Sequence, residues 1–411
     1  MRIKKIYLAI IIITTLFIGV GTGFIIIRFS NKVPNPHDSF NLEVQELIDQ
    51  YEIPSLAAGI LIKDDFIWAK GFGEQPDLDT VYMIGSITKT FTATAILQLK
   101  DNNLLNLDED INDYLPFEVR NPNYPNTSIT FRFLLTHRAG LPRNLFWSLE
   151  YYFNNQTIEW INENLDLGGN ITIWDDRPSL EEFLNGSLTP NGSYYDPYNW
   201  QYQPGSQFSY SNTGYQLLGY LVEQIANQTL VEYFQENIFE PLDMTSTGFY
   251  YQDFDGRNAI PYEWNNGTNF ELPLYDLNLP GVGALRSTIG DIVKYMMAHM
   301  NQGEYNIPYL LKPRTLDLMH SQDITLYGST DGFDLEGFGL GWFLYKNGLQ
   351  GHGGATPGYS ANIFLKESVK GDIGVVVMYN RGSALIYDGD LIYGFLPSIN
   401  NLLYERAQEL F

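Results

Sequence analysis

The residues of this chain whose types and spacing best suit catalysis are Ser86 and Lys89, three positions apart in a Ser-Ile-Thr-Lys stretch. The stretch follows an extended apolar run, residues 81–85, and begins a run with helical apolar spacing. Residues three apart lie on one face of a helix, so the hydroxyl and the amine are predicted to meet near a helix N-terminus. That pair has the chemistry of a nucleophile beside its base. Taken alone, the motif more often marks an N-cap serine followed by a solvated lysine.

Two further stretches carry groups that such a pair would need. Tyr210 directly precedes a helical apolar pattern, and Asn212 follows it by two positions. A phenol at this helix entry could approach the Ser86–Lys89 pair from a second wall of a cleft. His352–Gly354 begins a glycine-dense run before a strand-like segment. Glycines let backbone N–H groups come close to a ligand, as an oxyanion hole requires, although such a run alone more often marks a hairpin turn.

The N-terminal and middle parts of the chain differ in the elements that they predict. A helix is expected at residues 40–51, followed by a hairpin of two strands at residues 55–63 and 66–71. From about residue 102 to 280, helical patterns alternate with long aromatic loops. Within this part, residues 145–204 show few periods and are interpreted as a loop-rich insertion over a site. The middle is therefore predicted to be a mainly helical lobe.

Strand patterns return in the C-terminal part, at residues 338–345, 360–366 and 373–379. The last of these is a continuous apolar run, which is typical of a buried central strand. A helix from about residue 391 to 410 ends the chain. Strands at both ends around a helical middle predict an α+β fold, in which one layer is built from the two termini and the helical lobe is inserted.

The N-terminus carries a candidate membrane anchor. Residues 6–27 form a run of 22 uncharged, mainly apolar residues, which as a helix would span about 33 Å, enough for a bilayer core. The run is longer than a signal-peptide core and no small-residue cleavage site follows it, so an uncleaved signal anchor is expected. Basic residues in the 1–5 tail predict that this tail is cytoplasmic. A linker, residues 28–39, would then lead to an extracytoplasmic catalytic domain, residues 40–411.

Composition excludes several classes of function. The net charge of −24 argues against nucleic-acid binding, and the absence of cysteine excludes disulfides, thiolate metal sites and cysteine nucleophiles. No metal site is predicted, because His37, His299 and His320 have no acidic or histidine partner at metal-ligand spacing. Sequons make N-glycans a candidate modification and support export mildly. They lie at Asn126, Asn155, Asn170, Asn185, Asn191, Asn227 and Asn266.

With these stretches in this order, the chain resembles the serine β-lactamase and penicillin-binding protein superfamily. It is most similar to the branch that contains class C β-lactamases, D-aminopeptidases and esterases. The resemblance runs from about residue 40 to 400, in family order. Beyond the Ser86–Lys89 motif, the matching stretches are residues 134–142, 210–219, 236–244, 283–288 and 351–359.

The resemblance implies a role for each of the matching catalytic positions. Ser86 would attack a carbonyl and form an acyl-enzyme, and Lys89 would take its proton. Tyr210 would pass a proton to the leaving group and help to activate the deacylating water. Asn212 would hydrogen-bond the lysine and the substrate. The fold implied is an antiparallel sheet flanked by helices, and no cofactor or metal is implied.

The glycine run would form the opposite wall of the site. The resemblance places the oxyanion between the backbone N–H groups of Ser86 and Ala355, with His352, Gly353 and Gly354 beside the substrate. β-Lactamases of the family carry Lys-Thr-Gly where this chain has His-Gly-Gly. Histidine is mostly neutral at pH 7, so the fixed positive charge that attracts a β-lactam carboxylate is missing. His352 is still expected to donate a hydrogen bond or to become positive at mildly acidic pH.

One further histidine, His137, lies where a predicted helix ends. We interpret it as a structural residue that caps this turn rather than as a catalytic one.

The sequence thus predicts a membrane-anchored extracytoplasmic serine hydrolase that acts on an ester or a small amide or peptide bond. Its expected partner is a small-molecule or peptide substrate, and its oligomeric state is left open. Within the same class, the alternative is a β-lactamase or a D-Ala-peptide carboxypeptidase or transpeptidase. From another class, the alternative is a catalytically inactive binding or scaffold protein, whose cleft the 145–204 insertion would fill.

Overall fold

The computed structural model describes most of the chain beyond its N-terminal segment. The described residues are 39–63, 65–143, 155–164, 178–254, 256–265, 267–277, 280–300, 310–367, 372–382 and 388–411. The predicted anchor at residues 6–27 lies outside them, as do residues 28–38 and much of the 145–204 insertion. Within the described ranges, no helix combines the length and the apolarity that a membrane crossing requires.

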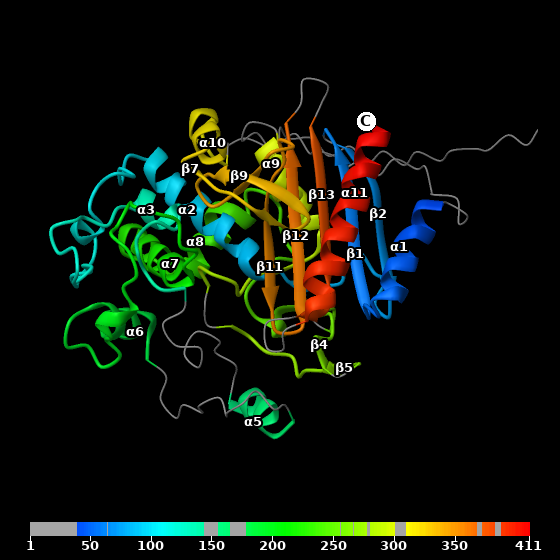
Figure 1. The fold of residues 1–411 in the computed structure, drawn as a ribbon, viewed down its shortest axis with the longest axis horizontal. Coiled ribbons are helices and arrows are strands. Elements are labelled where there is room, and N and C mark those ends of the chain that lie inside the picture. The colour runs from blue at the N-terminus through cyan, green and yellow to red at the C-terminus, as the bar shows by residue number, and fades with distance from the viewer. Residues whose placement is uncertain are drawn as a thin grey trace, which may run out of the picture.

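An antiparallel sheet forms the centre of the described structure (Figure 1). Nine strands belong to it among the described residues, and β8 (Ser329–Thr330) pairs only with β9. From one edge to the other, the remaining strands are β2 (Asp65–Gly73), β1 (Ser55–Ile62), β13 (Ile373–Tyr379), β12 (Tyr359–Lys366), β11 (Gln350–Thr356), β10 (Phe343–Tyr345), β9 (Phe333–Phe338) and β7 (Ile324–Thr325).

The two ends of the chain meet in the middle of this sheet. β1 pairs with β13 in continuous register from Leu56–Tyr379 to Ile62–Ile373. Every residue of β13 is buried, as its continuous apolar sequence predicts for a central strand. β2 lies at the edge and has exposed positions between buried ones. The prediction of an antiparallel α+β layer built from both termini is therefore confirmed.

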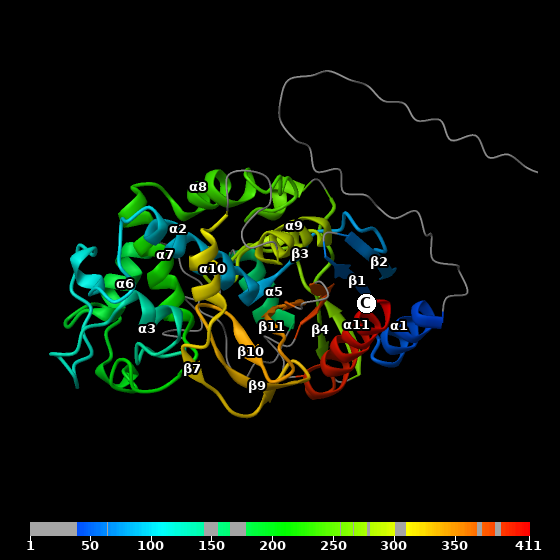
Figure 2. The ribbon, with the colours of Figure 1, turned by 90° about the horizontal axis from the view of Figure 1, so that it is seen from above.

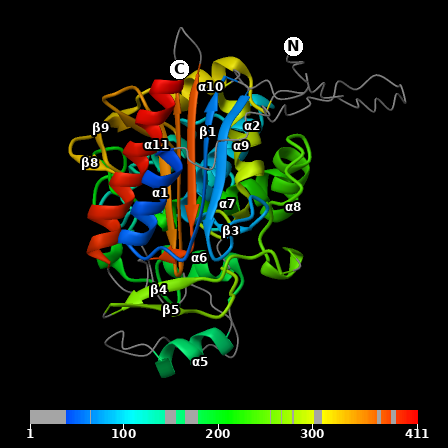
Figure 3. The same cartoon turned by 90° about the vertical axis from the view of Figure 1, so that its right-hand side faces the viewer.

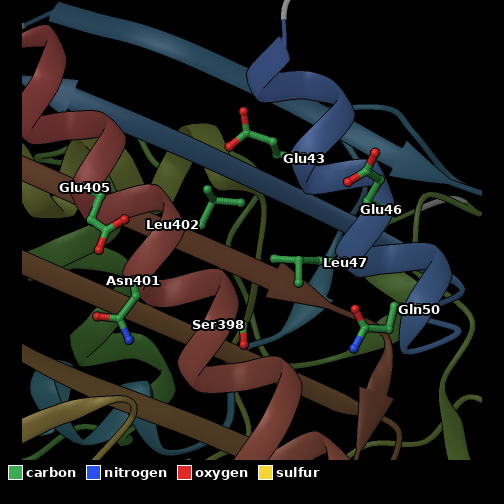
Figure 4. A pocket seen from close by; sticks show the side chains of 8 residues that line it. All are labelled: Glu43, Glu46, Leu47, Gln50, Ser398, Asn401, Leu402 and Glu405. Carbon is green, nitrogen blue, oxygen red and sulfur yellow. The ribbon is translucent and has the colours of Figure 1, made fainter.

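One face of the sheet is covered by the two terminal helices, α1 (Ser39–Gln50) and α11 (Leu396–Leu410), which lie side by side (Figures 1 and 3). A π-helical turn, Leu391–Phe395, leads into α11. Apolar side chains such as Val44 and Leu403 join those of β1 and β13 in one core. An open polar groove of about 410 Å³ separates the two helices (Figure 4). It is lined by Glu43, Glu46, Leu47, Gln50, Ser398, Asn401, Leu402 and Glu405.

The opposite face packs against helices of the middle of the chain, which extend away from the sheet as a lobe (Figures 1 and 2). In the core beneath them, Phe91 of α2 stacks on Tyr295 of α9 with ring centroids 3.9 Å apart. The helices on this side are α2 (Thr88–Asp101), α3 (Phe131–Leu135), α5 (Asn155–Asn164), α6 (Leu180–Leu188), α7 (Asn212–Ala226), α8 (Leu230–Phe234), α9 (Ile289–Met300) and α10 (Pro313–His320).

Shorter elements connect these layers. β3 (Tyr82–Met83) pairs with β6 (Arg286–Ser287), and β4 (Tyr262–Asn265) pairs with both β5 (Thr268–Glu271) and β14 (Arg381–Gly382). The short helical turns are Gly85–Ile87, Ile111–Asp113, Pro197–Asn199, Gln235–Phe239 and Tyr251–Phe254.

The strand predicted at residues 338–345 is wrong as a single element. β9 ends at Phe338 and β10 begins at Phe343, and the chain reverses between them so that these two residues pair. Gly341 lies in the turn with φ +89°, and a Cβ there would be 2.8 Å from the Ala93 Cβ. The break arises because α2 packs against this turn, which is a tertiary contact that a strand pattern does not report.

The glycine run combines a strand with the hairpin turn that the sequence indicated. Most of the run, Gln350–Thr356, is itself strand β11, and the hairpin turn occupies only residues 357–358. The register of β11 with β12 continues through the run, from Gln350–Leu365 to Thr356–Tyr359. Pairing with β12 thus keeps the glycine run extended, although its glycines have no side chains that could stabilise a strand by packing.

Candidate active site

Ser86 lies in the short helical turn, Gly85–Ile87, that connects β3 to α2. Gly85 adopts φ +53°, and a Cβ at this position would be 2.7 Å from the backbone nitrogen of Ala355. Only glycine combines this backbone conformation with such close contact to β11. The regular α-helix begins two residues later than Ser86, at Thr88. The predicted placement of Ser86 at a helix entry is therefore found, with a tighter first turn.

Lys89 lies one turn along from Ser86 and points back to it. Its Nζ donates hydrogen bonds to the Ser86 Oγ at 2.8 Å and to the Val282 carbonyl at 3.0 Å. The lysine is fully buried, whereas Ser86 is partly exposed. The carbonyl holds the amine in place independently of the serine. This arrangement suits proton transfer from a hydroxyl that substrates can reach.

Tyr210 approaches this pair from the entry of α7, as the sequence predicts. The Lys89 Nζ is 5.1 Å from the centre of the Tyr210 ring. The segment is held by its neighbour Ser211, whose Oγ caps α7 by accepting a hydrogen bond from the Gly214 N–H at 2.9 Å. Asn212 is the first residue of α7, and its backbone N–H donates to the Arg143 carbonyl at 2.9 Å. The structure thus brings the second motif against the first.

His137 holds the same segment from the other side. It is buried with φ +54°, and its Nδ1 accepts a hydrogen bond from the Ser211 N–H at 3.0 Å. Its ring lies against the Tyr210 ring with centroids 4.2 Å apart. Burial lowers the pKa of His137 well below its usual value, and the nearby Lys89 charge lowers it further. His137 is therefore a neutral acceptor that orients the tyrosine segment, which its turn position in the sequence did not reveal.

The glycine run lies directly against the Ser86 turn. A Cβ on Gly354 would be 1.9 Å from the Ile84 carbonyl oxygen and 3.0 Å from the Ser86 nitrogen. A Cβ on Gly353 would be 2.9 Å from carboxamide and carboxylate oxygens of Asn362 and Asp331. The geometry matches the expected close approach of backbone segments at Gly354, whereas the close neighbours of Gly353 are side-chain oxygens.

The strand register indicates where the backbone groups of β11 point. Thr356 and Tyr359 flank the two-residue turn and form a hydrogen-bonded pair, and such pairs alternate along an antiparallel ladder. The N–H of Ala355 therefore points away from β12, toward the Ser86 turn. The amides of Ser86 and Ala355 lie on adjacent segments, as an oxyanion hole between them requires.

His352 lies on the face of β11 that is turned toward Lys89 and Tyr210. Its ring is 6.3 Å from the Tyr210 ring and 5.4 Å from the Phe343 ring, between centroids. Its Nδ1 is 2.6 Å from the Gly353 carbonyl oxygen, so Nδ1 carries the proton and Nε2 has a free lone pair. Burial, and then the Lys89 charge, lower the pKa of His352 to about 3. The expectation that it becomes positive at mildly acidic pH is wrong, because its surroundings are dry and already positive.

Two other histidines, which lack a partner at metal-ligand spacing in the sequence, meet in the folded chain. The His299 Nδ1 and the His320 Nε2 are 3.0 Å apart, between α9 and the end of α10. Both rings pack on Trp342, with centroids 5.1 and 4.9 Å away. No group of three or more metal-ligating side chains occurs among the residues that the structure describes.

The fold and this arrangement define the class: a β-lactamase-type fold of the serine hydrolases. Residues 40–389 match the family model described as Beta-lactamase. The chain therefore belongs to the β-lactamase family.

Individual relatives are similar at moderate identity. Beta-lactamase-like protein 2 of Dictyostelium discoideum is 29% identical over 313 residues, which are 70% of this chain and 51% of that protein. Protein flp of Staphylococcus aureus strain MRSA252 is 25% identical over 84% of this chain and 62% of its own length. The chain thus spans about half to two thirds of the length of these curated relatives.

Solved structures share the fold. The octameric penicillin-binding protein homologue from Pyrococcus abyssi is 26% identical with a TM-score of 0.71, over 90% of this chain and 77% of that one. The D-amino acid amidase from Ochrobactrum anthropi SV3 is 20% identical with a TM-score of 0.64, over 90% and 98%.

Proposed function

We propose that the protein is a membrane-anchored serine hydrolase that acts outside the cytoplasm, through a Ser86 acyl-enzyme, on an ester or a small amide bond. The observation that carries this proposal is the 2.8 Å contact from the buried Lys89 Nζ to the partly exposed Ser86 Oγ, beside the glycine edge of β11. A structural lysine has no need of a hydroxyl partner that substrates can reach.

Acylation begins at Ser86. Neutral Lys89 takes the hydroxyl proton as the Oγ–carbon bond forms, and burial favours the neutral amine that this step requires. The carbonyl oxygen becomes an oxyanion and accepts hydrogen bonds from the N–H groups of Ser86 and Ala355. Comparable donors each contribute about 3–4 kcal/mol. Collapse of the tetrahedral intermediate restores the carbonyl and breaks the bond to the leaving group, which receives a proton through Tyr210.

Deacylation repeats these steps with water as the nucleophile. Tyr210 and Lys89 take the proton of the attacking water, and the new tetrahedral intermediate expels the Ser86 oxygen. The serine regains its proton and the product leaves as an acid. Asn212, at the start of α7, would hold the substrate beside Lys89. All of these steps use groups of the chain, with no cofactor.

The neutral state of His352 favours ester or peptide substrates over β-lactams. A lysine on β11 would present a fixed charge to a β-lactam carboxylate, whereas His352 with a pKa of about 3 is neutral at physiological pH. Solved structures with this fold include a D-amino acid amidase, which supports an amide as one substrate class. A β-lactamase or D-Ala-peptide carboxypeptidase or transpeptidase is the second candidate within the class.

The first test is hydrolysis of p-nitrophenyl acetate by the full chain and its Ser86→Ala variant. Turnover that falls to the background rate with Ser86→Ala supports the proposed nucleophile. Ser321→Ala, which changes an exposed serine at the end of α10, is the matched control and should retain wild-type turnover. Background rates in all three chains would favour the inactive scaffold.

The membrane anchor and the location of the catalytic domain belong to the same proposal. They are supported by the uncharged run at residues 6–27 and the basic residues before it. Proteinase added to intact cells that express the full chain should degrade residues 40–411 and leave an N-terminal fragment in the membrane. Complete protection in intact cells, with degradation after lysis, would contradict this orientation.

A further inference from the structure

Arg143 lies on the loop that runs along the Tyr210 segment. The Pro142 carbonyl accepts a hydrogen bond from the Ser211 Oγ at 2.6 Å. The Arg143 carbonyl accepts one from the Asn212 N–H at 2.9 Å. Two consecutive loop residues are thus bonded to two consecutive residues of the catalytic motif. The backbone that carries the Arg143 side chain is therefore fixed relative to the site.

The Arg143 side chain reaches the catalytic phenol. Its guanidinium carbon is 5.6 Å from the centre of the Tyr210 ring, and the Lys89 Nζ is 5.1 Å from the same centre. The two basic side chains differ in burial, because Lys89 is fully buried and Arg143 is exposed. Lys89 is thus placed for proton transfer at the bottom of the site, whereas Arg143 is placed where a ligand from solvent can meet it.

Among the described residues, two basic side chains, Lys89 and Arg143, lie beside the Tyr210 ring, although the chain as a whole has a net charge of −24. Among the residues that the structure describes, the ionisable groups that lower the pKa of His137 are Lys89, His352 and Arg143. The pKa of His352 is lowered by Lys89 in the same way. Because His352 is consequently neutral, β11 contributes no charge to this region. An exposed positive charge beside Tyr210 is supplied by Arg143, on the loop that runs along the Tyr210 segment.

We propose that Arg143 is a specificity-determining residue that binds a carboxylate carried by the leaving group of the substrate. This inference rests on the proposed function, in which Tyr210 gives its proton to the leaving group. A substituent on that group extends past Tyr210, and the guanidinium lies against the Tyr210 ring. Arginine binds carboxylates through two parallel hydrogen bonds, so it discriminates by charge and by shape.

The test compares two esters that differ in one charge, 3-acetoxybenzoate and its methyl ester, as substrates of the full chain. Arg143→Gln should lower the ratio of kcat/KM for the anion to kcat/KM for the neutral ester by about 10- to 100-fold. The loss should appear mainly in KM, because the carboxylate is bound in ground state and transition state alike. Arg143→Lys should keep part of the preference. Arg314→Gln, an exposed arginine on α10, should leave the ratio unchanged.

A binding measurement separates this inference from the proposed function. Calorimetry on the Ser86→Ala chain compares the two leaving groups, 3-hydroxybenzoate and methyl 3-hydroxybenzoate, and requires no turnover. Tighter binding of the anion that Arg143→Gln abolishes supports the carboxylate site, even if the hydrolase proposal fails. Equal binding of the two compounds overturns it, and so does an equal loss of turnover on both esters, which would mean that Arg143 acts on Tyr210 instead of on the substrate.

Discussion

Two pairs of buried histidines lie on the same side of the central sheet and have different surroundings. His137 and His352 flank Tyr210, whereas His299 and His320 contact each other and pack on Trp342. Burial lowers the pKa of all four, to about 3 for His352 and about 4 for His320. In the first pair, the Lys89 charge adds to this effect. In the second, the main added charge on His299 is that of its own partner.

The difference shows that a neutral, buried histidine can serve either chemistry or packing. His137 accepts a backbone N–H from the segment that carries Tyr210, so its loss would move a reacting group. His299 bonds only to the end of α10 among the described residues, so its loss would loosen two helices. Burial and pKa alone do not separate these roles. What separates them is the group at the other end of the hydrogen bond.

The largest expected effect comes from replacing one hydrogen-bonded histidine of each pair, His137 or His299, by leucine. His137→Leu leaves the Ser211 N–H without a partner, displaces Tyr210 and should lower kcat for p-nitrophenyl acetate by about 10- to 100-fold. His299→Leu should leave kcat within about twofold and lower the free energy of unfolding by about 1–3 kcal/mol. Steady-state kinetics with p-nitrophenyl acetate measure kcat, and urea denaturation measures the free energy of unfolding, both on the full chain.

His137→Asn is the control for this comparison. The asparagine Oδ1 can replace the Nδ1 acceptor, and asparagine tolerates the φ of +54° at this position. Most of the kcat lost in His137→Leu should therefore return. If both substitutions at residue 137 reduce kcat equally, the hydrogen bond to Ser211 is not what positions the tyrosine.

The second expected effect is a loss of stability in mild acid. Because burial lowers the folded-state pKa of these histidines below the value of about 6.5 in the unfolded chain, the unfolded chain binds more protons below that pH. The contribution of these neutral histidines to the free energy of unfolding is thus fully present above pH 6.5 and decreases as the pH falls. For His320, the decrease continues down to its folded-state pKa of about 4. When the pH is lowered from 7.5 to 5.5, each buried histidine that stays neutral in the folded chain should lower the free energy of unfolding by about 1.4 kcal/mol.

Urea denaturation at these two pH values tests the contribution of the second pair. In the double variant His299→Leu/His320→Met, the difference between the two pH values should shrink by about 2–3 kcal/mol relative to the wild type. The catalytic rate at pH 7.5 should remain near that of the wild type. An unchanged pH difference would mean that these two histidines titrate normally in the folded chain.

The smallest expected effect is that of a positive charge at residue 352. His352→Lys should raise the preference for carboxylate-bearing esters by about threefold, because the new ammonium attracts the carboxylate. The effect should be small, because burial and the nearby Lys89 amine lower the pKa of the new lysine and so reduce the fraction that is charged. The same pair of acetoxybenzoate esters measures this ratio. An unchanged ratio would place residue 352 away from the bound substrate, and would leave Arg143 as the recognition group.

Much of the fold was predictable from apolar patterns. The continuous run of β13, the hairpin of β1 and β2 and the terminal helices follow from local periodicity and appear close to the predicted bounds. The prediction failed where a tertiary contact opposed the pattern. The apolar residues around Gly341 suit a strand, yet packing against α2 turns the chain back there.

The sequence by itself determined that Ser86 and Lys89 lie on one face at a helix entry, since residues three positions apart share a helix face. It also indicated that the glycine run permits close approach of the backbone, because glycine has no side chain to prevent it, and the contact with the Ser86 turn is a tertiary one.

Only the tertiary structure decided what surrounds that pair. His137 and Ser211 are 74 positions apart, and no spacing rule connects them. The same holds for Arg143 beside Tyr210 and for His299 beside His320. The neutral state of His352 depends on burial and on the distance to Lys89. These properties arise from the shape of the folded chain, because solvent exclusion and charge proximity are set by packing and not by order in the sequence.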